Sequence, residues 1–307
     1  MAGLLFEWIG HHKLFRQVTV RAKIRGLEPL LVGAGKEAIL ESPADITLLK
    51  ILDVRSGSLK PVIPGSSWKG AFRAHAVRLC RTCGLNVCDG VPRSTCLRGT
   101  EFKQLERAGA SIFDKLNMIV TGGISVCILD LIFGAPGILS HVFFNDSYPT
   151  NNYRIGYRTM VAIDRRTGAS SRSALFTVEY VEPGAIFDFT LIVENLPNYA
   201  LGLLFEVLKD LNEGIVKVGG LKSRGFGRVA VESLSIAIKE FGSNVKALRA
   251  LDPIDEKVDV GTEVLEGEEA WELVDNLIGV WHRSLDKLRK ISDEGWRWGA
   301  VVEGAGR

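Results

Sequence analysis

Residues 61–73 read PVIPGSSWKGAFR, and this stretch decides the fold prediction because it joins three structural signals. An apolar segment that is typical of a strand ends at Pro64 and Gly65, which are turn residues. Ser66 or Ser67 then supplies a good N-cap, so a helix is predicted to begin there. The stretch therefore predicts a strand, a turn and a helix in direct succession.

The predicted helix, from Trp68 to Leu79, carries two cations near its start. Lys69 and Arg73 are four residues apart, which places both side chains on one helix face. Backbone N–H groups in the first turn of a helix are unpaired and attract anions. Cations and free N–H groups together suit an RNA phosphate, whereas a plain strand–turn–helix with a good cap is the alternative interpretation.

Strand and helix patterns alternate along the chain in two similar units. Residues 15–25, FRQVTVRAKIR, alternate between apolar and polar side chains, so they are predicted to form a strand with one buried face. A second strand pattern at 186–193 is followed by a helical pattern at 199–212. Two such units with antiparallel connections are typical of a ferredoxin-like α+β core, which is the RRM-like topology of RNA-recognition modules.

Composition limits the classes of protein to which the chain can belong. Its 307 residues are 46% hydrophobic, which is enough for a sizeable core. The formal net charge of +2 excludes a highly basic nucleic-acid coat, so any RNA site requires local clusters of Lys and Arg. No apolar run is long enough for a membrane span, and the N-terminus lacks a secretory pattern. A cytoplasmic protein without membrane contacts is expected.

The two ends of the chain differ from the part between them. Residues 1–14 are predicted to be an N-terminal extension, and 241–307 a C-terminal helical extension, of a core at 15–240. In the C-terminal part, five apolar residues follow a helical stripe, which favours a helix packed on the core over a helix that binds a partner. These residues are Leu273, Leu277, Trp281, Leu285 and Leu288.

A glycine-rich segment, VGGLKSRGFGRV at 218–229, follows the second predicted helix. Its glycines allow the backbone to approach a partner closely. Lys222, Ser223 and Arg224 add hydrogen-bond donors that suit phosphate groups. A glycine-rich loop alone is a weak indication of a protein family, but the loop and the segment at 61–73 together form a fairly specific pattern.

In this order and at this distance, the two segments resemble those of the RAMP superfamily, which includes backbone subunits of CRISPR-Cas type III effector complexes. The segment LIFGAPGILSHVFFNDSYP resembles the Phe-Gly segment and the following strand of the same family. Residues 150–178, which are rich in Arg, resemble the β-hairpin "thumb" that reaches over a neighbouring subunit's stretch of guide RNA. The resemblance covers residues 15 to 238.

The resemblance implies a subunit that binds guide RNA (crRNA), which pairs with target RNA. The implied partners also include other type III subunits and copies or paralogues of the chain itself. Phosphate contacts and base stacking do not read sequence, so no guide-sequence preference is expected. The residues expected to contact RNA are Ser66, Ser67, Lys69, Arg73, Arg158, Arg165, Arg166, Lys222, Ser223 and Arg224.

The resemblance also implies a ribonuclease site in the loop that follows the first strand. Family members that cut target RNA carry an Asp there, and Asp45 is the best match, with Glu37 and Glu41 as alternatives. The implied chemistry is attack of a ribose 2′-hydroxyl on the adjacent phosphate, with Mg²⁺ as cofactor. Two other interpretations stay open: a structural RNA-binding subunit without catalysis and, less favoured, an enzyme that processes precursor guide RNA through a His general base.

Four of the five cysteines lie close together and predict a metal site. They are Cys80, Cys83, Cys88 and Cys96. In a cytosolic chain this density favours a metal over disulfides, so the four are predicted to bind a structural Zn²⁺ ion in an insertion at 80–100. His75 lies close enough in sequence to replace one of them. Cys127 lies in an apolar run and is predicted to be a buried core residue.

Overall fold

The computed structural model describes residues 2–33, 43–54, 57–91, 95–97, 100–163, 166, 170–242 and 246–303. These residues form a mixed α+β structure, as the sequence predicts. The strands of the main sheet are β1 (Arg16–Gly26), β4 (Val142–Phe144), β7 (Ile186–Glu194), β8 (Val229–Glu240) and β11 (Val264–Glu266). The helices that matter for its core are α1 (Gly65–Thr82), α5 (Asn198–Glu213) and α6 (Gly267–Asp293). Within the described part of the chain, no helix is long and apolar enough to cross a membrane.

The main sheet has the order β11-β8-β1-β7-β4, and all of its neighbouring strands are antiparallel. Strand β1 lies at its centre because it pairs with β7 on one side and with β8 on the other. Val20, for example, lies opposite Leu191 and Ile236. All three side chains are buried, and they belong to the apolar face that the alternation at 15–25 predicts.

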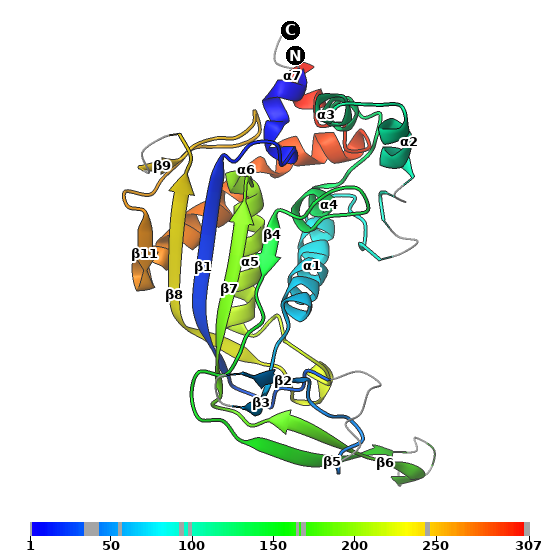
Figure 1. The fold of residues 1–307 in the computed structure, drawn as a ribbon, viewed down its shortest axis with the longest axis vertical. Coiled ribbons are helices and arrows are strands. Elements are labelled where there is room, and N and C mark those ends of the chain that lie inside the picture. Colours follow the sequence, from blue (N-terminus) through cyan, green and yellow to red (C-terminus); the bar gives the residue numbers. More distant parts are fainter. Residues whose placement is uncertain are drawn as a thin grey trace.

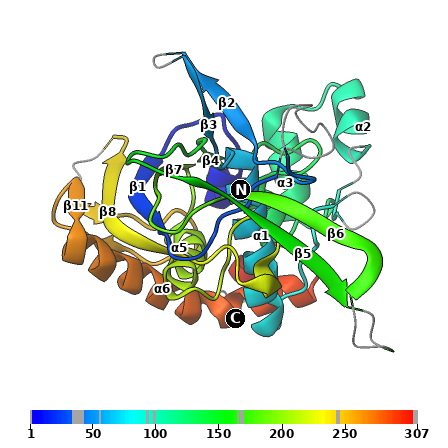
Figure 2. The same ribbon diagram turned by 90° about the horizontal axis from the view of Figure 1, so that it is seen from below.

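Helices α1, α5 and α6 cover one face of this sheet (Figure 1, Figure 2). Helices α5 and α6 pack closely because Gly202 has no side chain, and an added Cβ would collide with the backbone oxygen of Leu277. The apolar stripe expected near the C-terminus is buried on α6, from Leu273 to Leu288. The prediction of a helix packed on the core is therefore confirmed.

Two aromatic residues anchor α1 to the sheet. Trp68 and Phe72 are fully buried, and their rings lie 5.0 and 6.0 Å, between centroids, from the ring of Phe189 on β7. The Nε1–H of Trp68 donates a hydrogen bond to Ser147 Oγ at 2.8 Å. These contacts fix the rotation of α1 about its own axis, and so they decide which of its side chains face outward.

Two hairpins extend from the end of the sheet near which α1 begins (Figure 1). One pairs β5 (Ile155–Ile163) with β6 (Ser170–Val181), and the other pairs β2 (Lys50–Asp53) with β3 (Ser58–Pro61). The segment before β2 joins the two hairpins, because Ile46 forms a bridge with Val178 of β6. The first hairpin occupies the stretch in which the sequence predicts a thumb.

The two ends of the chain pack together at the other end of the sheet (Figure 1). In η1 (Ala2–Ile9), the Nε1–H of Trp8 donates to Asp252 Oδ2 at 2.8 Å, and its ring packs edge-on against Trp298, with 6.0 Å between centroids. The N-terminal segment is therefore part of the core. The remaining elements are α2 (Glu101–Arg107), α3 (Ile112–Val120), α4 (Ile128–Phe133), η2 (Lys222–Arg224), β9 (Ala247–Leu248), β10 (Val258–Asp259) and α7 (Ala300–Glu303).

Candidate RNA-binding cleft and cysteine group

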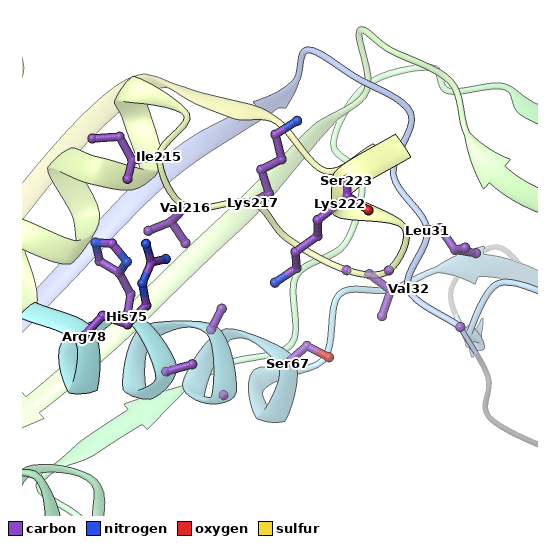
Figure 3. A pocket seen from close by; sticks show the side chains of 16 residues that line it. Leu31, Val32, Ser67, His75, Arg78, Ile215, Val216, Lys217, Lys222 and Ser223 are labelled. Atoms are coloured by element: carbon purple, nitrogen blue, oxygen red, sulfur yellow. The ribbon is translucent and has the colours of Figure 1, made fainter. Parts of the chain in front are cut away.

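A cleft of about 630 Å³ opens between α1 and the loop that joins α5 to β8. Figure 3 shows it with α1 on one side and the loop on the other. Its lining comes from residues 31–33, from the face of α1 between Ser67 and Arg78, and from the loop between Ile215 and Ser223. None of the described residues that line the cleft is acidic, so it suits an anionic ligand.

The side of α1 that faces the cleft consists largely of small residues. Gly70, Ala71 and Ala74 follow Ser67 on one helical stripe, and Arg78 continues it. Ser67 is half-buried, whereas Arg78 is exposed. Because the side chains between them are short, a ligand can approach the helix surface closely while it contacts a hydroxyl at one end and a guanidinium at the other.

The opposite wall is the glycine-rich loop, which Gly219 holds in place. This residue has φ +81°, a conformation that favours glycine, and an added Cβ would collide with the backbone oxygen of Leu31. The N–H of Gly220 donates to the same oxygen at 2.7 Å. The close approach expected of these glycines is therefore, at this point, an approach to the chain's own backbone.

The loop then directs Lys222 into the cleft. Leu221 has a left-handed backbone conformation, with φ 54° and ψ 29°, which is uncommon for a non-glycine residue, and η2 begins directly after it. Lys222 extends toward α1, whereas Lys217 points away from it (Figure 3). The Nζ of Lys217 forms an ion pair with Glu28 at 2.8 Å, so Lys222 is the loop cation that the cleft presents to a ligand.

His75 also lines the cleft, one turn before Arg78. Its side chain is 6% exposed, and its Nε2 lies 2.5 Å from Asp210 Oδ2 on α5. The carboxylate fixes the orientation of the imidazole ring. From the sequence His75 is expected only as a substitute zinc ligand. Its partner lies 135 residues away, so no local pattern could reveal the pair.

Lys69 and Arg73 share a helix face, as their spacing predicts, but this face is turned away from the cleft. Lys69 Nζ donates to Ser140 Oγ at 3.1 Å, and Arg73 forms an ion pair with Asp130 at 2.5 Å. The reason is the helical period, because positions 69 and 73 lie roughly opposite the stripe that begins at Ser67. The phosphate contacts predicted for these two cations are therefore not supported by their positions.

The start of α1 differs from the prediction as well. The N-cap residue is Pro64, which makes no side-chain capping hydrogen bond, so neither Ser66 nor Ser67 has the expected role. The N–H of Gly65 donates to Asp146 Oδ1 at 2.8 Å, which places a carboxylate of the protein where an RNA phosphate was expected. Ser66 is exposed outside the cleft lining, whereas Ser67 belongs to it.

Asp45, the predicted catalytic residue, is exposed beside β6 of the β5–β6 hairpin. Its Oδ2 accepts a hydrogen bond from the N–H of Thr177 at 2.6 Å, and its own N–H donates to Thr177 O at 2.9 Å. Asp45 does not line the cleft, but it is connected to it. Four residues later, the N–H of Leu49 donates at 2.8 Å to the backbone oxygen of Val32, which does line the cleft.

Among the expected thumb residues, Arg158 bridges the β5–β6 hairpin and the glycine-rich loop. Its guanidinium lies over the rings of Tyr180 and Phe226, at 5.3 and 5.0 Å from their centroids. Arg166 and Arg224 are exposed and do not line the cleft, whereas Ser223 does. Three residues named from the sequence lie outside the described residues, and they are Glu37, Glu41 and Arg165.

The structure groups the cysteines differently from the prediction. Four side-chain donor atoms lie within 4.8 Å of one another, and they belong to Cys88, Cys96, Cys127 and Asp130. Cys80 and Cys83 are not in this group. Because α1 continues to Thr82, Cys80 is fully buried on the core side of the helix, and burial raises the pKa of its thiol. The observed group replaces the predicted one, and it could hold a metal ion such as zinc.

The thiols of this group interact with one another. The Sγ atoms of Cys88 and Cys127 lie 3.6 Å apart, and this interaction lowers the pKa of Cys88 while it raises the pKa of Cys127. Burial raises the pKa of Asp130. Cys127 is buried, as predicted, but it lies beside the other donor side chains of this group as well as in the apolar core.

Comparison with known proteins identifies the family. No curated protein matches the chain. Residues 23–230, more than half of the chain, match the family model of the RAMP superfamily. The match includes α1, the glycine-rich loop, the β5–β6 hairpin and the cysteine group. The chain therefore belongs to the RAMP superfamily, as the segments at 61–73 and 218–229 predict.

Proposed function

We propose that this chain is a guide-RNA-binding subunit of a type III CRISPR effector complex, and that the guide backbone lies in the cleft between α1 and the glycine-rich loop. Membership of the RAMP superfamily supports the broader part, a CRISPR-associated RNA-binding subunit. The cleft supports the location, because its lining presents cations and hydroxyls without any described acidic side chain.

The observation that carries the proposal is the placement of donors on both walls. Ser67 and Arg78 come from α1, and Lys222 and Ser223 come from the loop. A single RNA strand that passes between the walls would receive phosphate contacts from both sides, while Gly70, Ala71 and Ala74 leave room for the backbone. Lys69 and Arg73 have no part in this proposal, because their side chains bind other protein groups.

The open face of the sheet is a weaker candidate for RNA binding. The order β8-β1-β7-β4, with α1 and α5 on one face, supports a ferredoxin-like core, whose RRM members bind RNA through stacking aromatics on the sheet. Here the aromatic residues Phe187 and Phe189 of β7 are buried on the helix-covered side. On the opposite face, the central strands β1 and β7 carry residues such as Arg21 and Lys23 and no aromatic side chain, so stacking of bases there is less favoured than binding in the cleft.

The β5–β6 hairpin would act as the thumb that contacts RNA or a neighbouring copy in the assembled complex. Arg158 supports this role, because it ties the hairpin to Phe226 of the glycine-rich loop, whose preceding residues line the cleft. Tyr157, Val161 and Leu175 are exposed on the hairpin, so it presents aromatic and apolar side chains to a partner.

The cleft is tested with single substitutions on each wall. Arg78→Ala and Lys222→Ala should each weaken binding of a labelled single-stranded RNA by roughly tenfold or more, because each removes a charge-assisted hydrogen bond of about 1.5–3 kcal/mol. Each should also reduce the slope of log K against log salt by about 0.7. Fluorescence anisotropy of the full chain at several salt concentrations measures both quantities.

Lys69→Ala is the matched control, because it removes a cation from the same helix on the face that binds Ser140. It should leave the RNA affinity within about twofold of wild type. If Lys69→Ala weakened binding as much as Lys222→Ala, the guide would not be held by the cleft face of α1.

Cleavage of target RNA is a second candidate function, and the placement of Asp45 favours it. The carboxylate is exposed, and the backbone of Thr177 fixes one of its oxygens. A fixed carboxylate of this kind could hold Mg²⁺ or orient a 2′-hydroxyl for attack on the adjacent phosphate. In this proposal, Asp45 decides whether the chain cuts target RNA or serves only as a scaffold.

Asp45→Asn distinguishes the two, because an amide oxygen can still accept the hydrogen bond from Thr177 while the charge is lost. In the guide-loaded complex with Mg²⁺, the variant should bind target RNA normally and cut it roughly a hundredfold more slowly. Equal rates of cleavage in gel assays would assign this chain a purely structural role.

A further inference from the structure

We propose that Cys88, Cys96, Cys127 and Asp130 together bind one Zn²⁺ ion, which links the chain between α1 and α2 to the start of α4. This site is separate from the RNA-binding cleft, and it does not depend on the function proposed above. Its donors come from two stretches that lie about thirty residues apart in the sequence, so it is not a self-contained knuckle.

The distances within the group fit one tetrahedral ion. With Zn–S bonds of about 2.3 Å and a Zn–O bond of about 2.0 Å, two sulfurs lie about 3.8 Å apart and a sulfur and an oxygen about 3.5 Å apart. Cys88 Sγ lies 3.6 Å from Cys127 Sγ and 3.2 Å from the carboxylate oxygens of Asp130. Cys96 completes the set, because all four donor atoms lie within 4.8 Å of one another.

The local structure explains why the donors converge. Cys127 is the N-cap residue of α4 and Asp130 lies in its first turn, three residues later, so the two side chains project from the same end of the helix. Cys88 and Cys96 themselves lie outside helices and strands, between α1 and α2. Four protein donors fill a tetrahedral shell, which is typical of a structural zinc site.

Arg73 provides the second layer of the site. Its guanidinium contacts Asp130 Oδ1 at 2.5 Å, the backbone oxygen of Gly134 at 3.0 Å and Cys88 Sγ at 3.7 Å. Three thiolates and a carboxylate carry four negative charges, which a divalent ion and this cation largely balance. A hydrogen-bonded outer cation of this kind orients the ligating carboxylate, and it connects the site to α1.

At Gly90 the backbone lies directly against the guanidinium of Arg73. Gly90 has φ +72°, and an added Cβ would collide with the guanidinium of Arg73. The chain therefore crosses directly over Arg73 between Cys88 and Cys96. Arg73 belongs to the segment at 61–73, for which a phosphate contact was predicted. In this proposal its role is structural instead.

The donor spacing also separates zinc from the alternatives. A structural disulfide would use two of the three thiols and leave the third beside a buried carboxylate. Arg73 would then have no role beyond charge balance. A polynuclear iron–sulfur cluster holds its thiolates farther apart than a single ion does, and 3.6 Å between Cys88 and Cys127 leaves no room for one. Three sulfurs and one oxygen suit zinc better than Mg²⁺ or Ca²⁺.

The metal content of the purified full chain tests the site. Elemental mass spectrometry should find about one zinc per chain in wild type, as a four-donor structural site requires. Cys127→Ser should lose most of this zinc. Cys83→Ser is the matched control, since it removes a half-buried thiol of the sequence-based set that lies outside the observed group. It should keep the zinc of wild type.

A second measurement covers the case in which Cys127→Ser fails to fold. The unmodified chain, stripped of metal under reducing conditions, should bind one Co²⁺ and develop the thiolate charge-transfer and tetrahedral d–d absorption bands of a sulfur-rich site. Any of three results would overturn the proposal: wild-type protein without zinc that takes up no Co²⁺, stoichiometric iron, or zinc that disappears in Cys83→Ser and persists in Cys127→Ser.

Discussion

On α1, neighbouring polar side chains have different tasks because each residue turns the helix by about 100°. Ser67 and Arg78 face the cleft, whereas Lys69 and Arg73 face Ser140 and Asp130. Burial, followed by the nearby charge of Arg73, lowers the pKa of Lys69, which agrees with its inward position. The polar residues of one helix are therefore divided between a face that lines the cleft and a face that contacts other parts of the protein.

His141 is a second residue whose environment has a measurable consequence. It is fully buried, its Nδ1 lies 2.9 Å from the backbone oxygen of Glu194, and its ring stacks on His11. Burial, together with the neighbouring His11, lowers its pKa to about 3, against 6.5 for an unperturbed His. Below pH 6.5 the unfolded chain binds a proton at this position that the folded chain does not bind, so stability is lost as the pH falls toward 3.

His141→Asn should isolate this effect, because an amide can still donate to Glu194 while it does not titrate. The variant should be less stable than wild type at pH 7. The difference in unfolding free energy between the two should shrink by about 2 kcal/mol between pH 7 and pH 5. Urea unfolding of both proteins at these two pH values measures the change. A difference that stays constant would mean that the fold does not lower the pKa of His141.

At the scale of elements, the sequence predicts which segments are strands more reliably than it predicts their partners. A strand is expected at 186–193, and β7 is indeed found there, directly after β6. They belong to different sheets, however, because β6 pairs with β5 whereas β7 pairs with β1 and β4. Alternation fixes which side of a strand is buried, but pairing depends on segments far away in the sequence.

The cysteines illustrate the same division between local and distant information. Phe72, Ala76 and Cys80 are spaced by four, and all three are fully buried. Extending the helical period of α1 by one more turn would have placed Cys80 in the core and removed it from the predicted zinc set. No local pattern could have added Asp130, whose place beside Cys88 and Arg73 follows only from the packing of α4 against α1.

The residues of the cleft could also be predicted from the sequence only in part. Lys222 and Ser223 lie in a glycine-rich loop that the sequence marks clearly, and they line the cleft. Arg78 was missed, although it lies on the stripe that contains Ser67, because the motif draws attention to the helix start. The pairing of His75 with Asp210 requires α1 and α5 to pack together, which no single segment encodes.

At the scale of the whole molecule, the two ends of the sheet differ in character. The N- and C-terminal segments close one end through buried tryptophans and Asp252, which accepts hydrogen bonds from Trp8 and Tyr199. The two hairpins extend from the opposite end, where Asp45 contacts β6 (Figure 1). One end of the molecule is thus a packed core, and the other presents the groups that suit RNA.

The most direct test of the central claim is to map where RNA contacts the full chain. Single-stranded RNA that carries photoreactive 4-thiouridine is cross-linked to the purified protein, and the modified peptides are identified by mass spectrometry. Binding in the cleft predicts cross-links to residues 67–78 of α1 and 215–223 of the loop that joins α5 to β8. Cross-links confined to the open face of the sheet, at Arg21 and Lys23 of β1, would contradict it.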